Sequence, residues 1–173
     1  MCKEILFSVV IPSYNSSNTI ERSINSILQQ NYQNFEILII DDGSNKLTKK
    51  VYKKIIKKSK KIRIIFNKNN LGVSKSRNIG INFSRGKYII FLDSDDFFLK
   101  NFFQNLRDLI SSNNPEAVIA QNKFISSNIS DKKLFTKLFE KRQLSFFCWS
   151  YILQKKFIKK NKIFFEDIKV FED

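Results

Sequence analysis

Short apolar runs alternate with amphipathic stretches along most of the chain, and this order constrains the fold more than any other feature. The runs are rich in Ile, Val, Leu and Phe and predict five strands: 6–11, 35–40, 62–66, 88–92 and 117–120. Stretches with apolar residues at helical spacing follow the first four and predict helices: from about residue 18, 47–58, 73–83 and from about residue 102. Such alternation is typical of an α/β domain with a mostly parallel twisted sheet and helices on both faces.

Two local patterns refine the helices. Asn18 and Glu21 are spaced as in a capping box and predict the start of the first helix. Ser76 and Gly80 are small residues one turn apart, so the backbone of the third helix is expected to lie close to the sheet. After about Gln121 the periodicity weakens, and the sequence shows no repeat and no linker. We therefore expect a single domain.

The chain is strongly basic. Its 173 residues include 31 Lys plus Arg against 16 Asp plus Glu, a formal charge of +15. This excess favours an acidic ligand, a nucleic acid or an anionic membrane surface, and charge alone does not choose among them. The basic run 46–63 interleaves lysines with apolar residues, which fits either a solvated helix face or a surface attracted to anionic lipid.

The chain has no histidine, the residue that most often performs acid–base chemistry at neutral pH. Any catalysis must therefore depend on carboxylates, Lys, Tyr or a metal ion held by oxygen ligands. Cys2 and Cys148 lack the spacing of a zinc site or a disulfide framework, so a cytoplasmic, reducing setting is expected. The first apolar run is too short to span a bilayer, and we interpret it as a strand.

Polar clusters follow three of the predicted strands, at 12–15, 41–44 and 93–96. In an open α/β sheet, ligands bind in the crevice beyond the carboxyl ends of the strands, where such clusters meet. Several carboxylates facing one crevice repel one another, and a divalent metal with oxygen ligands relieves that repulsion. Helix caps are the alternative role, because Asp and Ser also favour cap positions. Neither GxxxxGK[ST] nor GxGxxG follows a strand, which argues against a P-loop ATPase or a dinucleotide dehydrogenase.

The segments SVVIPSYNSSNTIERSINSILQQNYQNFEILIIDDGS and NNLGVSKSRNIGINFSRGKYIIFLDSDD resemble the nucleotide-binding half of the family 2 glycosyltransferases. The resemblance covers about residues 7–96, with several motifs in the family's order. It implies the GT-A fold and transfer of a sugar, with inversion, from a nucleoside diphosphate sugar to an acceptor hydroxyl. A UDP-sugar is the expected donor, and a glycan or lipid-linked saccharide is the expected acceptor.

The resemblance also implies roles for individual residues. Pro12, Tyr14 and Asn15 would border the base and ribose, with the Tyr14 ring stacked on uracil. Asp42 would accept the uracil N3 proton, as a carboxylate can. Asp93 would lie near the ribose as the first residue of the family's DxD pair.

Asp95, the second residue of that pair, would bind the divalent metal, Mn²⁺ or Mg²⁺, that bridges the diphosphate. Arg77 and Asn78 match the family in a stretch where either a ligand contact or a packing role is expected. The final segment IFFEDIKVFED resembles the family's Glu-Asp segment, which makes Asp173 the general base. Trp149 would either form the floor of the acceptor site or pack in the core.

The resemblance divides the domain into residues 1–121, the nucleotide-sugar-binding half, and 122–173, an acceptor-side segment. Family members continue past the Glu-Asp motif, so the segment is expected to be truncated. Three functions stay open: an active glycosyltransferase for polysaccharide biosynthesis, a catalytically impaired nucleotide-sugar-binding protein, and a basic nucleic-acid-binding module. The enzyme is our leading hypothesis, with no nucleic acid as partner. Peripheral contact with anionic lipid on the cytoplasmic face of the membrane is expected from the charge.

Overall fold

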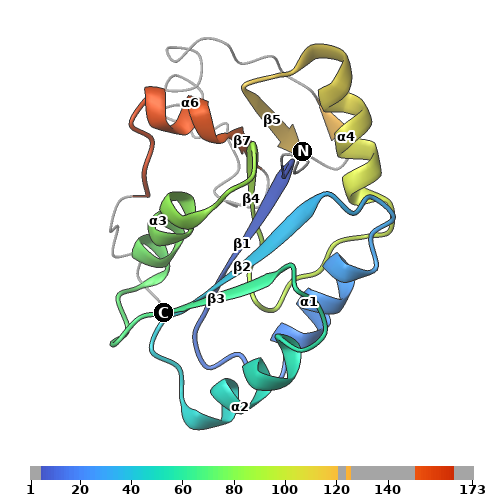
Figure 1. The fold of residues 1–173 in the computed structure, drawn as a ribbon. Helices are drawn as coiled ribbons and strands as arrows, with labels where there is room; N and C mark the ends of the chain where they lie inside the picture. The colour runs from blue at the N-terminus through green and yellow to red at the C-terminus, as the bar shows by residue number, and fades with distance from the viewer. Residues whose placement is uncertain (1–4, 121–123, 126–150, 166–173) are drawn as a thin grey trace.

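A computed structural model describes residues 5–120, 124–125 and 151–165 (Figure 1). These residues form a seven-stranded sheet with the order β3-β2-β1-β4-β7-β5-β6. The bounds of the strands are β1 Phe7–Ser13, β2 Phe35–Asp41, β3 Ile62–Phe66, β4 Tyr88–Phe91, β5 Ala117–Ala120, β6 Phe124–Ile125 and β7 Tyr151–Gln154. Strands β1 to β4 are parallel to one another, and β7, β5 and β6 extend the sheet through antiparallel pairs.

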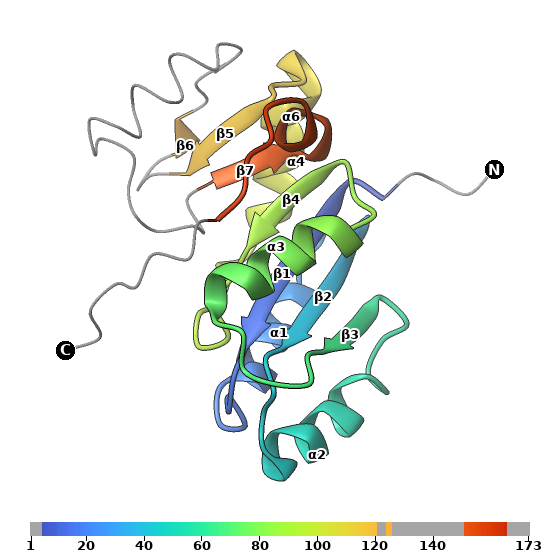
Figure 2. The same cartoon turned by 90° about the vertical axis from the view of Figure 1, so that its left-hand side faces the viewer.

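Helices cover both faces of the sheet, and Figure 2 shows α3 crossing in front of the parallel strands. Their bounds are α1 Ile20–Leu28, α2 Lys46–Ile55, α3 Val73–Phe83, α4 Phe102–Asn113 and α6 Lys155–Lys160. Helices α1, α2 and α4 pack on one face, while α3 and α6 pack on the other. The predicted α/β class and the predicted parallel strands are confirmed.

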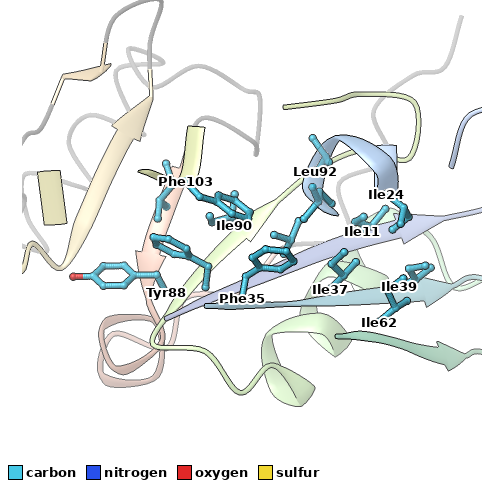
Figure 3. Close-up of a cluster of buried hydrophobic side chains, with 14 of the residues drawn as sticks. Ile11, Ile24, Phe35, Ile37, Ile39, Ile62, Tyr88, Ile90, Leu92 and Phe103 are labelled. Atoms are coloured by element: carbon cyan, nitrogen blue, oxygen red, sulfur yellow. The ribbon is translucent and has the colours of Figure 1, made fainter. Parts of the chain in front are cut away.

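Alternate residues of each strand feed the two cores, because successive side chains point to opposite faces of a sheet. Phe7, Val9 and Ile11 of β1 belong to the α1 side, whereas Val10 belongs to the α3 side. Figure 3 shows the larger cluster, in which strand residues meet Ile24 of α1 and Phe103 of α4. Each such apolar side chain, when fully buried, contributes about 1.5–3 kcal/mol to the free energy of folding.

Helix α3 lies close to the sheet, as the small residues predicted. A Cβ atom added at Gly80 would lie 2.1 Å from Cγ1 of Val10, a distance that real atoms do not adopt. Ser76 and Gly80 are both buried, Ser76 fully so. The close packing of α3 therefore depends on the missing side chain at Gly80.

Two features differ from the sequence predictions. The first helix begins at Ile20 with Thr19 as N-cap and no side-chain cap bond, so the capping box was wrong. Glu21 instead pairs with Lys58 at 2.7 Å. Strand β7 and helix α6 were not predicted, because they are short and the apolar periodicity around them is weak. Helix α2 does have a side-chain cap, since Asn45 accepts a hydrogen bond from the Thr48 amide.

Candidate active site

The site lies beyond the carboxyl ends of β1, β2 and β4, where the parallel strands stop at a common edge. Strand β1 lies between the other two, with Ser13 in register with Asp41 and Val10 in register with Phe91. The chain leaves β1 and β2 toward α1 and α2 on one face, and it reaches β4 through α3 on the other. This change of direction between β1 and β4 is the switch point at which open α/β sheets bind ligands.

The loop after β1 is joined to the loop after β2. Asn15 has a positive φ of 52° and its amide donates to Oγ of Ser44 at 3.0 Å. Its Oδ1 accepts from the Asn45 amide at 2.9 Å. Tyr14 is 53% exposed next to this contact, whereas Pro12 is buried in β1. Asn15 therefore shapes the two loops, and the exposed Tyr14 ring is the surface available for stacking.

Asp42 is buried and organises the loop before α3. Its Oδ1 accepts from Asn67 Nδ2 at 2.8 Å and from the Leu71 amide at 2.9 Å. Its Oδ2 accepts from the Gly72 amide at 2.8 Å. A carboxylate has about four acceptor positions, so Oδ2 keeps capacity for one further donor. The sequence did not predict that Asp42 organises this loop. Its predicted contact with uracil stays a prediction.

Asp93 pairs with Arg77 of α3, with NH2 and Oδ1 2.9 Å apart. Gly72, which binds Asp42, precedes Arg77 by five residues, or about 7.5 Å of helical rise. The N-cap of α3 therefore contacts Asp42, and Arg77 on the same helix contacts Asp93. The ion pair with Asp93 is a contact that the sequence did not predict for Arg77, and the choice between a ligand contact and a packing role stays open.

Asp95 and Asp96 complete the acidic cluster. Asp95 is exposed, and its backbone oxygen accepts a hydrogen bond from Arg22 of α1. Partial burial raises the pKa of Asp96, and the charges of Asp95 and Asp93 raise it further. Asp95 and Asp93 therefore lie close enough to Asp96 to disfavour its charged form.

This donor set fits a hard divalent cation. No three acidic, His or Cys side chains are arranged as a metal site within the described ranges. Mg²⁺ and similar ions commonly bind through one or two carboxylates, with phosphate and water as the other ligands. Asp95, whose carboxylate is exposed, stays the residue predicted to hold such an ion, which would supply Lewis acidity toward a diphosphate.

A buried chain of hydroxyl groups lies beneath the loops. The Tyr52 hydroxyl of α2 donates to Oδ1 of Asp41 at 3.0 Å, and its oxygen lies 2.7 Å from Oγ of Ser13. Ser13 in turn contacts Oγ of Ser16. Burial raises the pKa of Tyr52 to about 12. Tyr52 therefore stays neutral and donates to Asp41, which fixes the end of β2 next to Asp42.

Asn78 has a role that the sequence left open. Its Nδ2 donates to the backbone oxygen of Phe165 at 2.9 Å, and its Oδ1 accepts from the Phe165 amide at 2.9 Å. The Phe165 ring packs edge-on against Phe91 and lies 5.4 Å from the Arg77 guanidinium. Asn78 therefore fastens Phe165, which belongs to the predicted acceptor-side segment, to α3. Asp173 and Trp149 lie outside the described residues, and their roles stay predictions.

The family model for glycosyl transferase family 2 matches residues 8–170. The chain belongs to this family. A curated relative, the UDP-Glc:alpha-D-GlcNAc-diphosphoundecaprenol beta-1,3-glucosyltransferase WfgD of Escherichia coli, is 32% identical over 125 residues, which cover 72% of this chain and 49% of WfgD. Among the first curated relatives that it matches, the chain spans from 17% to 54% of their length.

Solved structures share the fold. The TarS structure from S. aureus in complex with UDP-GlcNAc has a TM-score of 0.73 at 22% identity and covers 93% of this chain and 48% of TarS. The mannosyltransferase PcManGT from Pyrobaculum calidifontis in complex with GDP-Man and Mn²⁺ has a TM-score of 0.68 at 14% identity and covers 92% of this chain and 47% of PcManGT. The GT-A fold expected from the sequence is confirmed. Within the described part of the chain, no helix has the length and hydropathy needed to cross a membrane.

Proposed function

We propose that this family 2 chain binds a nucleoside diphosphate sugar, with UDP as the nucleotide, and transfers the sugar with inversion to a glycan or lipid-linked acceptor. The observation that carries the proposal is the common edge at which Asp42, Asp93 and Asp95 follow parallel strands. Helix α3 contacts the first two through Gly72 and Arg77. TarS and PcManGT, which share the fold, were solved with a nucleotide sugar.

Each residue has a defined part in this proposal. Tyr14 stacks on the base, Asp42 accepts from uracil N3 through Oδ2, and Asp93 binds the ribose while Arg77 orients it. Asp95 holds a divalent metal, Mn²⁺ or Mg²⁺, next to the diphosphate. Asp173 takes the proton from the acceptor hydroxyl, which attacks the anomeric carbon in line with the leaving diphosphate. The absence of histidine is consistent with a carboxylate base.

Calorimetric titration with UDP, in the presence of either Mn²⁺ or EDTA, tests the binding step. We expect Mn²⁺ to tighten UDP binding in the wild-type chain and to have no effect in Asp95→Ala. Asp108→Ala is the matched control, because Asp108 is an exposed carboxylate on α4, and it should behave like the wild type. Equal Mn²⁺ enhancement in Asp95→Ala would overturn the metal role.

Transfer or hydrolysis of UDP-sugars, measured as release of UDP, tests the chemical step. We expect release above background in the wild type and a loss of release in Asp173→Asn. Normal UDP binding without any release in the wild type would favour the alternative of a catalytically impaired nucleotide-sugar-binding protein.

We also propose that the chain associates peripherally with anionic lipid on the cytoplasmic face of a membrane. Helix α2 exposes five lysines, and its first turn contains no acidic residue; the lysines are Lys46, Lys49, Lys50, Lys53 and Lys54. The acceptor of WfgD, named as a diphosphoundecaprenol, is lipid-linked. Each lysine near an anionic membrane surface contributes about 1 kcal/mol to the free energy of membrane binding.

Co-sedimentation with neutral and anionic vesicles tests this association. Binding should require anionic lipid and weaken in the double variant Lys49→Gln/Lys50→Gln. The variant Lys159→Gln/Lys160→Gln removes the same charge from α6 on the opposite face of the sheet and serves as control. Equal binding to neutral vesicles, or equal losses in both variants, would contradict the proposal.

A further inference from the structure

Residues 92–101, which carry the acidic cluster, contain no helix or strand and are held by α1 and by Gln30, which follows that helix. Ser23 and Ser26 lie three residues apart on α1, so they fall on one side of it. Gln30 lies two residues beyond Leu28, the last residue of α1. Each of these three side chains makes a hydrogen bond to the segment that runs from Ser94 to Phe103.

Gln30 makes the most of these contacts. It is 3% exposed, and its Nε2 donates to the backbone oxygen of Leu99 at 2.9 Å. The same nitrogen donates to the backbone oxygen of Ser26 at 3.0 Å, while Oε1 accepts from the Phe103 backbone amide at 3.2 Å. Both ends of the carboxamide are therefore occupied, one by the acidic segment and one by the start of α4.

Ser26 and Ser23 hold the segment closer to the aspartates. Oγ of Ser26 accepts from the Phe98 amide at 3.0 Å, and Oγ of the fully buried Ser23 donates to the Ser94 oxygen at 2.9 Å. Ser94 lies between the two residues of the DxD pair. Side chains of α1 therefore hold the backbone on either side of Asp95, whereas Asp93 follows β4 directly and is held by Arg77.

Apolar packing holds only part of this segment, since Leu92 lies in the core and Phe98 packs against it. Phe97 is 54% exposed and Leu99 is 74% exposed, although Phe98 stacks on Phe102 at 4.3 Å. An open groove of about 1190 Å³ lies beside the segment, lined by α1, by residues 29–31 and by Phe97, Phe98, Lys100 and Asn101. A segment with exposed apolar side chains beside a groove depends on its hydrogen bonds for a fixed position.

We infer that Ser26 and Gln30 are positioning residues for the metal-binding carboxylate of Asp95. This inference rests on the proposed function, because it assigns them an effect on the metal step. Neither side chain is expected to touch donor or metal. Residues that orient a metal ligand from behind typically change metal affinity by about tenfold or more when they are replaced.

Two variants and two matched controls test the inference. Gln30→Met keeps the length of the side chain and removes its three hydrogen bonds, whereas Gln29→Met makes the same change at an exposed neighbour. Ser26→Ala removes the acceptor for Phe98 together with a bond to the Ser23 oxygen at 2.7 Å. Ser111→Ala on α4 removes a similar local bond, to the Asp108 oxygen, and no loop contact, so it controls for that loss.

Each protein is titrated with Mn²⁺ in the presence of UDP and with UDP in EDTA, and hydrogen exchange is followed across residues 94–103. We expect Gln30→Met to weaken Mn²⁺ affinity about tenfold, to leave UDP binding in EDTA unchanged and to speed exchange in that segment. Ser26→Ala should do the same to a smaller extent, and it carries the test alone if Gln30→Met does not fold. Both controls should match the wild type.

Unchanged Mn²⁺ affinity in Gln30→Met and Ser26→Ala would overturn the positioning role and leave the proposed function intact. Loss of UDP binding in EDTA to the same extent as Mn²⁺ affinity would also overturn it, because the effect would then be structural. A wild-type chain that gains nothing from Mn²⁺ would instead remove the metal from the proposed function, and the positioning role with it.

Discussion

Arg77 on α3 and Asp93 after β4 form an ion pair with 2.9 Å between NH2 and Oδ1, and their side chains are only 15% and 28% exposed. The same guanidinium lies over the ring of Phe165, in the predicted acceptor-side segment. Its Nε is buried without a hydrogen-bond partner among the described residues. One side chain thus contacts both an expected donor-binding residue and a residue of the expected acceptor side.

Replacing Arg77 should weaken both the fold and donor binding. We expect Arg77→Ala to lower the free energy of unfolding by about 1–2 kcal/mol, because it leaves a partly buried carboxylate without its charged donor. UDP affinity should fall as well, since Asp93 loses its orientation. Urea unfolding and UDP titration measure the two effects.

Arg107→Ala is the matched control. Arg107 pairs with Asp108 at the same distance of 2.9 Å, but both side chains are about half exposed. Exposed pairs contribute little, so stability and UDP affinity should stay close to those of the wild type. Equal losses in the two variants would show that the Arg77 contact has no special role.

The two hydrogen bonds between the Asn78 side chain and the Phe165 backbone, here called the clamp, give a second prediction. Asn78→Asp keeps the acceptor for the Phe165 amide and places a carboxylate oxygen against the Phe165 carbonyl, which removes a donor and adds repulsion. We expect faster hydrogen exchange at residues 163–165 and a loss of stability of about 1–3 kcal/mol. Asn82→Asp makes the same change at an exposed position of α3 and should have little effect. Similar exchange in both variants would argue against the clamp.

The parallel half of the fold could be predicted from sequence because each of its strands is a continuous apolar run. The Phe35–Asp41 strand is buried along its whole length, so hydrophobicity alone marks it. Strand β7 gave no such signal, since it has four residues and its partners, β4 and β5, are distant in sequence. Antiparallel pairs of this kind depend on tertiary contacts that no local pattern records.

In the candidate site, likewise, the sequence could identify some residues but not the contacts that they make. Asp42 and Asp93 could be selected because carboxylates at strand ends form a visible pattern. The contacts that fix these two carboxylates could not be predicted, since Asn67 lies 25 residues from Asp42 and Arg77 lies 16 residues from Asp93. Amide and guanidinium side chains have many possible partners, and only the packed structure selects one.

The contact between Gly80 and Val10 predicts a size-dependent coupling. Gly80→Ala should destabilise the chain by about 1–3 kcal/mol, because the added Cβ overlaps Cγ1 of Val10. In the double variant with Val10→Ala that overlap disappears, so the combined loss should be smaller than the sum by about 1 kcal/mol. Urea unfolding of the four proteins gives this difference.

Gly86→Ala provides the control for this cycle. A Cβ at Gly86 would meet backbone atoms of Phe7 and Ser8 at 2.7–2.8 Å, which Val10→Ala does not remove. The losses of Gly86→Ala and Val10→Ala should therefore add. A cycle at Gly80 that is additive as well would mean that α3 moves away from the sheet instead of overlapping Val10.

The hydroxyl of Tyr52 is expected to stabilise the site in a pH-dependent manner. At about pH 8, Tyr52→Phe should lower the free energy of unfolding by about 1–3 kcal/mol, because Oδ1 of the fully buried Asp41 loses its donor. Tyr14→Phe, at a ring that is 53% exposed, should change stability little under the same conditions. An equal, small effect of both substitutions would contradict a structural role for the buried hydroxyl.

Raising the pH should then narrow the gap between the wild type and Tyr52→Phe. The pKa of Tyr52 rises from 10.0 to about 12 on folding, so the unfolded chain loses this proton first. Between these two values ionisation favours the unfolded wild type, a loss of at most about 2–3 kcal/mol that Phe cannot show. Urea unfolding of both proteins from about pH 8 to pH 11 measures the gap. A gap that stays constant over that range would mean that Tyr52 ionises as readily in the folded chain as in the unfolded one, and a gap that widens would mean that it ionises more readily in the folded chain.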